Sequence, residues 1–174
     1  SRNKILNKNK VRENDIILAI PSSGLHSNGF SLIRKILKNE KINKFLKKEL
    51  LLPTKIYTDE ILKLVKKNLI NSSANITGGG LIENIPRSIP ENLGANIDLS
   101  KIRVLKIFKW LKSKNITDIE MLKTFNCGVG FCLITESKNV KKINRYFNQK
   151  FRPYPIGYVS RSSKKINLIN KIKW

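Results

Sequence analysis

A strand, a glycine-bracketed polar loop and a helix follow one another within residues 15–39, and this unit constrains the fold more than any other stretch. The apolar run from Ile16 to Ile20 ends at Pro21, which is typical of a buried strand that enters a turn. After the loop GLHSNG, residues 30–39 place apolar side chains at the spacing of an amphipathic helix. The unit predicts a domain in which helices pack on a sheet.

The rest of the chain alternates between helical and strand patterns. We expect helices at about 58–69, 81–85, 104–113, 118–125 and 139–148, and strands at 94–100, 127–135, 152–160 and 164–172. Thr58 is the expected N-cap of the helix that it begins, with Asp59 and Glu60 in the first turn. Without a repeat or a low-complexity linker, the pattern predicts an α/β or α+β layered domain.

The net charge raises the question of an anionic partner. The chain carries 35 Lys+Arg against 12 Asp+Glu, a formal net charge of +23. These charges are spread along the whole sequence, and no aromatic residues are interleaved with them as in a base-stacking surface. We therefore favour a composition bias towards Lys, Asn and Ile, with weak polyanion affinity, over a specific nucleic-acid site.

Targeting and redox features predict a reducing, cytoplasmic setting without a membrane partner. No apolar run approaches the ~20 residues of a membrane span. The N-terminus SRNKILNKNK has no apolar segment behind it, so we expect no signal peptide, and the first residue, Ser1, suggests a processed or truncated chain. Cys127 and Cys132 are too few for a disulfide scaffold, and their odd spacing in an expected strand predicts opposite faces.

Two glycine-rich stretches form the candidate site. GLHSNG (24–29) and TGGG (77–80) each lead into an expected helix, where backbone N–H groups can converge on an anion. Each is equally compatible with a tight turn, and neither matches GxxxxGK[ST] or GxGxxG. The residues alone leave turn and site open.

His26 is the only histidine, and three roles are open to it. It is a candidate general acid or base, a hydrogen-bond donor to a ligand oxygen, or a structural residue satisfied by the backbone. Ser27 and Asn28 add groups that suit a polar ligand. Glu83 and Asn84, after TGGG, form either part of the site or a solvated helical turn. No carboxylate cluster of the kind that holds Mg²⁺ is present, so we expect no metal ligands in this chain.

Several motifs together resemble a known family. In order, GLHSNGFSLIRKIL, LLPTKIY, ITGGGLIENIPR, MLKTFNCGVGF and the IG at 156–157 resemble the C-terminal domain of the aminoimidazole ribonucleotide synthetases, from about Val11 to about Val159. The resemblance implies an α+β layered fold with a mixed sheet covered by helices, partly ferredoxin-like. It also implies that 1–174 is a single C-terminal domain, without the N-terminal ATP-binding and dimerisation domain.

The resemblance implies an ATP- and Mg²⁺-dependent cyclo-ligase of purine biosynthesis. Such an enzyme phosphorylates the formamide oxygen of formylglycinamidine ribonucleotide and then closes the imidazole ring. The implied partners are the nucleotide substrate, ATP, the N-terminal domain and a second copy in a homodimer, and the domain alone is expected to be inactive. The alternatives are a basic polyanion-binding module and a related ATP-dependent synthetase or kinase.

The resemblance carries over to individual residues. Those expected to line a cleft and hold phosphate or polar substrate edges, with His26 as a catalytic candidate, are Gly24, His26, Ser27, Asn28, Gly29, Thr77, Gly78, Gly79, Gly80, Glu83 and Asn84. Two positions depart from the family pattern: Asn75 replaces a usual histidine and Lys55 a usual arginine. An asparagine does not transfer protons at neutral pH, and a lysine keeps the charge but loses the bidentate fork.

Overall fold

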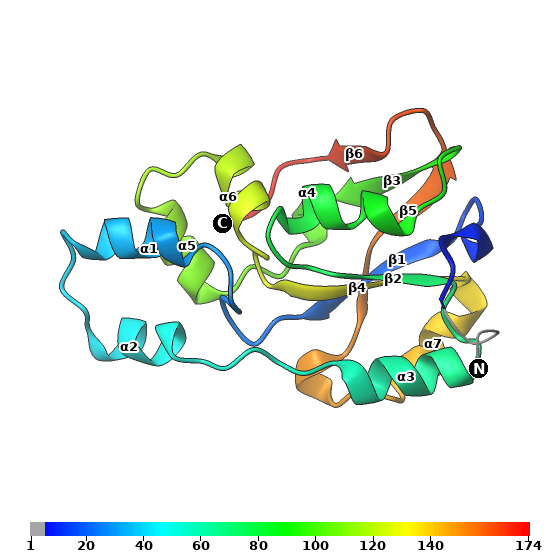
Figure 1. Ribbon diagram of the computed structural model, residues 1–174, viewed down its shortest axis with the longest axis horizontal. Coiled ribbons are helices and arrows are strands. Elements are labelled where there is room, and N and C mark those ends of the chain that lie inside the picture. The colour runs from blue at the N-terminus through cyan, green and yellow to red at the C-terminus, as the bar shows by residue number, and fades with distance from the viewer. Residues whose placement is uncertain (1–5) are drawn as a thin grey trace.

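The computed structural model describes residues 6–174 as helices packed on one six-stranded sheet (Figure 1). The strands are β1 (Ile16–Pro21), β2 (Ser72–Asn75), β3 (Leu93–Asp98), β4 (Val129–Thr135), β5 (Tyr154–Arg161) and β6 (Ile166–Ile169). Their order is β2-β4-β1-β5-β3-β6, and only β3 and β6 pair in parallel. The expected mixed sheet covered by helices is confirmed, while the partly ferredoxin-like topology stays a prediction. Residues 1–5, which open the segment used to predict the absence of a signal peptide, lie outside the described residues.

The helices are α1 (Phe30–Leu37), α2 (Lys44–Leu50), α3 (Thr58–Lys66), α4 (Gly80–Asn84), α5 (Lys106–Lys112), α6 (Asp118–Thr124) and α7 (Val140–Asn144). The sequence did not predict α2, which buries only Leu46, or β2, whose residues SSAN are short and polar. The predicted N-cap at Thr58 is wrong by one residue, since Tyr57 caps α3 without a side-chain bond. Asp59 and Glu60 lie in the first turn as predicted, where their negative charges interact favourably with the helix dipole.

Helices cover both faces of the sheet. Successive side chains of β1 are apolar and point to opposite sides, so each face has to be buried. Ile17 and Ala19 pack into one core cluster, with residues of α1, α4, α5 and α6. Leu18 and Ile20 pack into the other, with residues of α3 and α7. Figure 1 shows α4, α5 and α6 on one side of the sheet and α3 and α7 on the other. Within residues 6–174, no helix combines the length and the hydropathy that a bilayer span requires.

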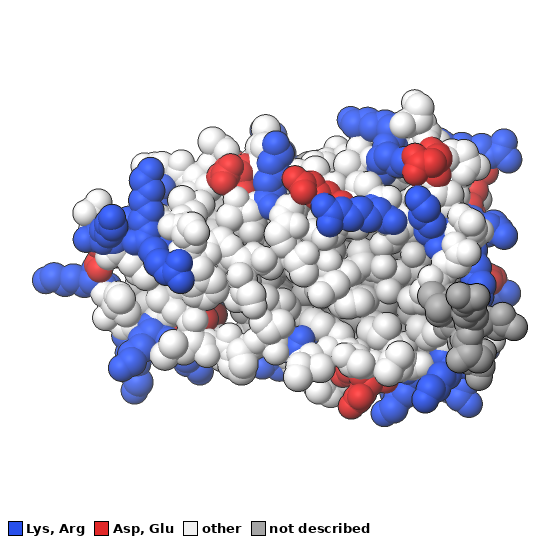
Figure 2. Space-filling model, viewed as in Figure 1, with Lys and Arg blue, Asp and Glu red and all other residues white. Residues whose placement is uncertain are grey.

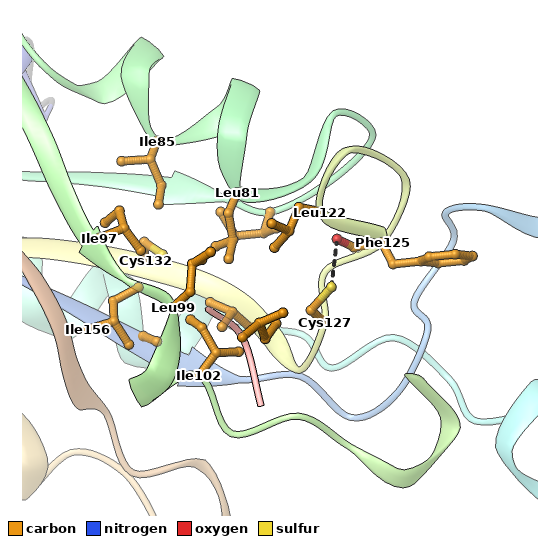
Figure 3. Packing of buried hydrophobic residues seen from close by; sticks show 14 of the residues in the cluster. Leu81, Ile85, Ile97, Leu99, Ile102, Leu122, Phe125, Cys127, Cys132 and Ile156 are labelled. Atoms are coloured by element: carbon orange, nitrogen blue, oxygen red, sulfur yellow. Dashed lines mark hydrogen bonds between the residues drawn. The ribbon is translucent and has the colours of Figure 1, made fainter. Parts of the chain in front are cut away.

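The two cysteines lie in the same core cluster, so the prediction that they point to opposite faces is wrong (Figure 3). Cys127 precedes β4 and has a φ of +51°, so the alternation of the strand does not extend to it. Its thiol donates to the carbonyl oxygen of Phe125 at 3.7 Å, and burial raises the pKa of that thiol to about 12. Both cysteines are buried and free.

Candidate functional site

The two glycine-rich stretches lie at the same end of the sheet. Strand β4 lies between β1 and β2 and runs antiparallel to both. The C-terminal ends of β1 and β2 therefore lie at the same end of the sheet, on either side of β4. The histidine loop (residues 22–29) follows β1, and the backbone N–H of Ser22 donates to the carbonyl of Gly128 at 2.9 Å. The triple-glycine loop (residues 76–80) follows β2, and the N–H of Ile76 donates to the carbonyl of Gly130 at 3.1 Å. Both loops therefore start from hydrogen bonds to the same segment.

The histidine loop ends at a residue that has to be glycine. Gly29 is the N-cap of α1 and has a φ of +77°, a left-handed conformation that glycine adopts without steric cost. A Cβ atom on Gly29 would also overlap the ring of Phe125. The glycine thus lets the loop turn tightly against the segment that precedes β4.

His26 is largely buried within this loop, with 8% of its surface exposed. Its Nε2 atom accepts a hydrogen bond from the backbone N–H of Ser23 at 3.2 Å. A neutral imidazole has one donor and one acceptor nitrogen, so the proton belongs on Nδ1. Burial lowers the pKa of His26 below its ordinary value of 6.5, which favours this neutral form at pH 7. The geometry favours a hydrogen-bond donor over a charged acid.

Tyr57 lies beside His26, with the ring centroids 6.2 Å apart. The Tyr57 hydroxyl donates to the carbonyl of Pro21 at 2.8 Å, and desolvation raises the pKa of this phenol. A Cβ atom on Gly130 would overlap the Tyr57 hydroxyl and lie 2.7 Å from Cε1 of His26. Glycine at this position of β4 therefore lets both rings approach the sheet.

Ser23 connects the histidine loop to the segment before α3. Its hydroxyl donates to the carbonyl of Pro53 at 2.8 Å and accepts from the backbone N–H of Lys55 at 3.0 Å. The Lys55 ammonium donates to Glu60 at 2.8 Å and to the carbonyl of Ile56 at 3.1 Å. The positive charge of Lys55 is therefore paired with a carboxylate five residues away in the same segment.

Asn84 shapes the triple-glycine loop from inside. Its side-chain amide donates to the carbonyls of Gly80 at 2.8 Å, Gly78 at 3.1 Å and Thr77 at 3.4 Å, and its oxygen accepts from the Thr77 hydroxyl at 3.3 Å. Only 6% of the residue is exposed. The polar atoms of Asn84 are thus used by its own loop, and its expected contact with a ligand stays a prediction.

Glu83 occupies the start of α4 and changes the electrostatics expected there. A Cβ atom on Gly79 would overlap the Glu83 carboxylate, which also pairs with Arg87 at 3.6 Å. A carboxylate in the first turn opposes the approach of an anion to that helix end. The carboxylate disfavours a phosphate at this helix start, while binding of polar ligand groups by Gly79, Gly80 and Glu83 stays a prediction. Within the loop itself, Thr77 and Gly78 are exposed.

The exposed tips of the two loops meet. The side-chain oxygen of Asn28 lies 3.8 Å from where a Cβ atom on Gly78 would stand. The hydroxyl of Ser27 lies 3.5 Å from that of Thr54. Ser27, Thr77 and Gly78 are exposed, whereas Gly24 is buried behind them. Of the predicted site residues, Ser27, Thr77, Gly78 and Glu83 are exposed and Asn28 is half-buried, with His26 packed below.

A pocket of about 340 Å³ lies next to this meeting point, between α3 and the end of β2. It is lined by Thr54, Lys55, Ile56, Tyr57, Thr58, Ile61, Leu62, Asn75 and Phe131. Asn75 is exposed there, and 78% of Ile56 is exposed at the rim. Leu62, 49% exposed, lines the same pocket, so two exposed apolar side chains lie together there.

The face that carries the loops is largely without charge at its centre. Figure 2 shows the blue and red side chains towards the ends and rims of this face, with a white area over β2 and β4. Within residues 6–174, no group of three His, Cys, Asp or Glu side chains is placed to hold a metal ion.

Sequence reasoning missed the residues that hold the loops from below. Ser23, Tyr57 and Gly130 each fix part of the site, yet none was assigned a role. The signal was present in part, since Tyr57 and Gly130 lie in the motifs LLPTKIY and MLKTFNCGVGF. Their function depends on contacts between segments far apart in the chain, which a motif does not reveal.

Comparisons with known proteins agree with these motifs. The family model described as AIR synthase related protein, C-terminal domain, matches residues 12–168. The chain is 42% identical over 161 residues to a phosphoribosylformylglycinamidine cyclo-ligase of Ligilactobacillus salivarius, covering 86% of this chain and 47% of the relative. It is 39% identical over 171 residues to the protein of that name from Clostridium kluyveri, covering 96% of this chain and 52% of the relative. The chain thus spans about half the length of these curated relatives.

Solved structures share the fold at low sequence identity. The thiamine-monophosphate kinase of Stenotrophomonas maltophilia aligns with a TM-score of 0.65 at 16% identity, covering 97% of this chain and 54% of the kinase. Thermotoga maritima PurL complexed with FGAR aligns with a TM-score of 0.62 at 13% identity, covering 95% of this chain and 27% of PurL. The family match, the identities near 40% and the fold lead to one conclusion: this chain belongs to the family of AIR synthase related proteins, as their C-terminal domain.

Proposed function

We propose that this chain is the C-terminal half of an ATP-dependent cyclo-ligase that converts formylglycinamidine ribonucleotide to aminoimidazole ribonucleotide. The observation that carries the proposal is the meeting of Asn28 and Gly78, which joins the two motifs of the family resemblance in one surface. The curated relatives at 42% and 39% identity bear the name of this activity. Because the chain spans about half of each relative, the reaction is assigned to the chain together with a second half.

In this proposal, the exposed tips of the loops bind the polar groups of the ribonucleotide. Ser27 and Asn28 offer a hydroxyl and an amide, and Gly78 lets a ligand approach the backbone closely. Neutral His26 donates its Nδ1 proton to an oxygen, either of the ligand or of a residue that touches it. The reaction transfers the γ-phosphoryl group of ATP to the formamide oxygen, after which the amidine nitrogen attacks the formyl carbon and phosphate leaves. Positioning of this kind supplies much of the rate in phosphoryl transfer.

ATP is part of the proposal, and the ligands of Mg²⁺ are assigned to the other half. Two of the structural neighbours are complexed with the ATP analogue AMPPCP. Mg²⁺ binding needs several carboxylate or carbonyl oxygens around one point. Glu83 is the one carboxylate in the two loop motifs, and it pairs with Arg87. The residues that the structure describes therefore do not fit a magnesium site.

The uncharged area over β2 and β4 is proposed as the contact surface for the other half of the enzyme. It combines the white area of Figure 2 with exposed Ile56 and Leu62 beside the pocket of 340 Å³. Burying such a surface against a second domain excludes water from the loops and strengthens their hydrogen bonds to a ligand. A homodimer built mainly by the other half, and a cytoplasmic setting in which both cysteines stay reduced, complete the proposal.

The net charge and the fold each suggest another function. A polyanion-binding module is not favoured, since the chain belongs to an enzyme family and its named relatives are ligases. A related synthetase or kinase shares the fold, as the thiamine-monophosphate kinase shows.

A chimaera that joins the N-terminal half of the Clostridium kluyveri relative to this chain distinguishes these functions. We expect ADP and inorganic phosphate to form from ATP with formylglycinamidine ribonucleotide, and no ADP to form with formylglycinamide ribonucleotide and glutamine or with thiamine monophosphate. Turnover of either of the latter two substrates instead would establish the related synthetase or kinase. Tight binding of duplex DNA by the chain with a steep salt dependence would support the polyanion module.

A further inference from the structure

The turn between α6 and β4 holds a buried asparagine that the proposed reaction has not used. Asn126 is fully buried, and each polar atom of its side chain has partners. Its oxygen accepts from the Ser22 hydroxyl at 3.0 Å and from the backbone N–H of Gly128 at 2.8 Å. Its amide nitrogen donates to the carbonyls of Gly24 at 2.9 Å and Leu25 at 3.3 Å.

These partners fix which way the amide points. The N–H of Gly128 is only a donor, so the Asn126 oxygen has to face it. The two amide hydrogens then face the carbonyls of Gly24 and Leu25, which are only acceptors. All four hydrogen bonds are made in a fully buried place, where an unsatisfied group costs most. An aspartate of the same shape would have no hydrogen to offer to either carbonyl.

The hydrogen bonds act directly on the histidine loop. Gly24 and Leu25 are the two residues before His26, and Ser22 begins the same loop. One side chain thus holds three of the five residues from Ser22 to His26, although it lies about 100 positions further along the chain. Asn126 thus holds the residues on both sides of Ser23, whose N–H donates to the His26 ring.

The same turn also contacts the end of the histidine loop and the start of α4. The ring of Phe125, next to Asn126, packs against Gly29 so closely that no Cβ atom fits there. The carbonyl oxygen of Phe125 lies 3.0 Å from where a Cβ atom on Gly80 would stand, and the carbonyl of Leu122 is closer still. Figure 3 shows Leu122 beside Leu81, the residue after Gly80, while the ring of Phe125 points away from them. The turn at 125–128 therefore lies against both loops.

We propose that Asn126 is a positioning residue for the site, which sets the conformation of the histidine loop relative to the triple-glycine loop. This inference rests on the proposed function for its effect on catalysis, but its effect on the loop is independent of it. Asn126 does not touch the ligand, and it acts through Gly24, Leu25 and the neighbouring His26. Loss of the amide N–H donors of Asn126 should change the conformation of the histidine loop, while the packing of the two core clusters stays the same.

The test compares Asn126→Asp with a matched control in the 174-residue chain. Asn139→Asp removes the same amide from a residue that is also buried, 9% exposed, and that donates to the carbonyl of Leu69 at 3.4 Å, away from the loops. Because His26 is the only histidine, its imidazole signals in an NMR spectrum need no assignment. Amide hydrogen exchange of residues 22–29 reports on the loop itself.

We expect Asn126→Asp to shift the His26 signals and to raise amide exchange in residues 22–29 by about tenfold or more, while Asn139→Asp changes neither. If Asn126→Asp does not fold, Ser22→Ala replaces it. That variant removes one hydrogen bond to the Asn126 oxygen and should shift the same signals to a smaller extent. Unchanged His26 signals and unchanged exchange in the variant that folds would overturn the inference.

Turnover of the chimaera adds a separate readout. Asn126→Asp should lower kcat by about tenfold or more with a smaller change in KM, because a misplaced group near the reacting atoms acts on the chemical step. Asn139→Asp should leave both constants unchanged. An inactive parent chimaera would count against the proposed function alone, since the NMR and exchange measurements decide the positioning role without turnover.

Discussion

The side-chain oxygen of Asn28 lies beside Gly78, 3.8 Å from where a Cβ atom would stand. These residues are 50 positions apart in the sequence, in the two glycine-rich motifs. They meet because β1 and β2 lie on either side of β4, run in the same direction and therefore finish at the same end of the sheet. The contact joins two separate loops into one surface.

Replacing Gly29 by alanine should destabilise the fold far more than the same change at Gly24. Gly29 has a φ of +77° and a Cβ atom would overlap Phe125, whereas a Cβ atom on Gly24 would meet Leu52 at an ordinary 3.5 Å. A left-handed conformation alone costs a residue with a Cβ about 1–2 kcal/mol. Urea unfolding should show a loss of about 2 kcal/mol or more for Gly29→Ala and less than about 1 kcal/mol for Gly24→Ala. Equal losses would show that the loop relaxes around the new side chain.

The sequence predicted one part of this site well and another part poorly. The strand, loop and helix at 15–39 were predicted because apolar periodicity and glycines act locally. The local contacts of Asn84 and Glu83 were not, since the Asn84 amide binds carbonyls of its own loop and the Glu83 carboxylate, although exposed, lies against Gly79. Strand β2 was missed because its four residues depend on pairing with β4 rather than on their own propensity.

Replacing Asn84 by alanine should loosen the triple-glycine loop. The change leaves the carbonyls of Thr77, Gly78 and Gly80 without the amide that they share. Loss of a buried donor costs about 1–3 kcal/mol in the free energy of unfolding. The control is Asn167→Ala, which removes an exposed hydrogen bond to Asn96 and should cost less than about 0.5 kcal/mol. A loss at position 84 no larger than that of the control would mean that the amide does not hold the loop.

His26 should titrate below its ordinary pKa of 6.5, because burial disfavours the imidazolium. The unfolded chain then binds the proton more readily than the folded one. The contribution of neutral His26 to the free energy of unfolding is therefore fully present above about pH 6.5. It is lost as the pH falls from there to the folded-state pKa. An NMR titration of the single histidine measures the value, and His26→Gln should remove this part of the pH dependence of unfolding. A pKa above 6.5 would contradict the neutral, donating imidazole.

The central claim is that the meeting of the two loops forms a ligand-binding surface. Gly78→Ala in the chimaera tests it most directly, because Gly78 is exposed, has no positive φ and has only the Asn28 oxygen near its Cβ position. The added methyl group should change the free energy of unfolding by less than about 0.5 kcal/mol. We predict that kcat/KM for formylglycinamidine ribonucleotide nevertheless falls by about tenfold or more, since displacement by 1 Å near reacting groups can cost about a hundredfold. Unchanged kcat/KM in a normally folded, active chimaera would contradict the account.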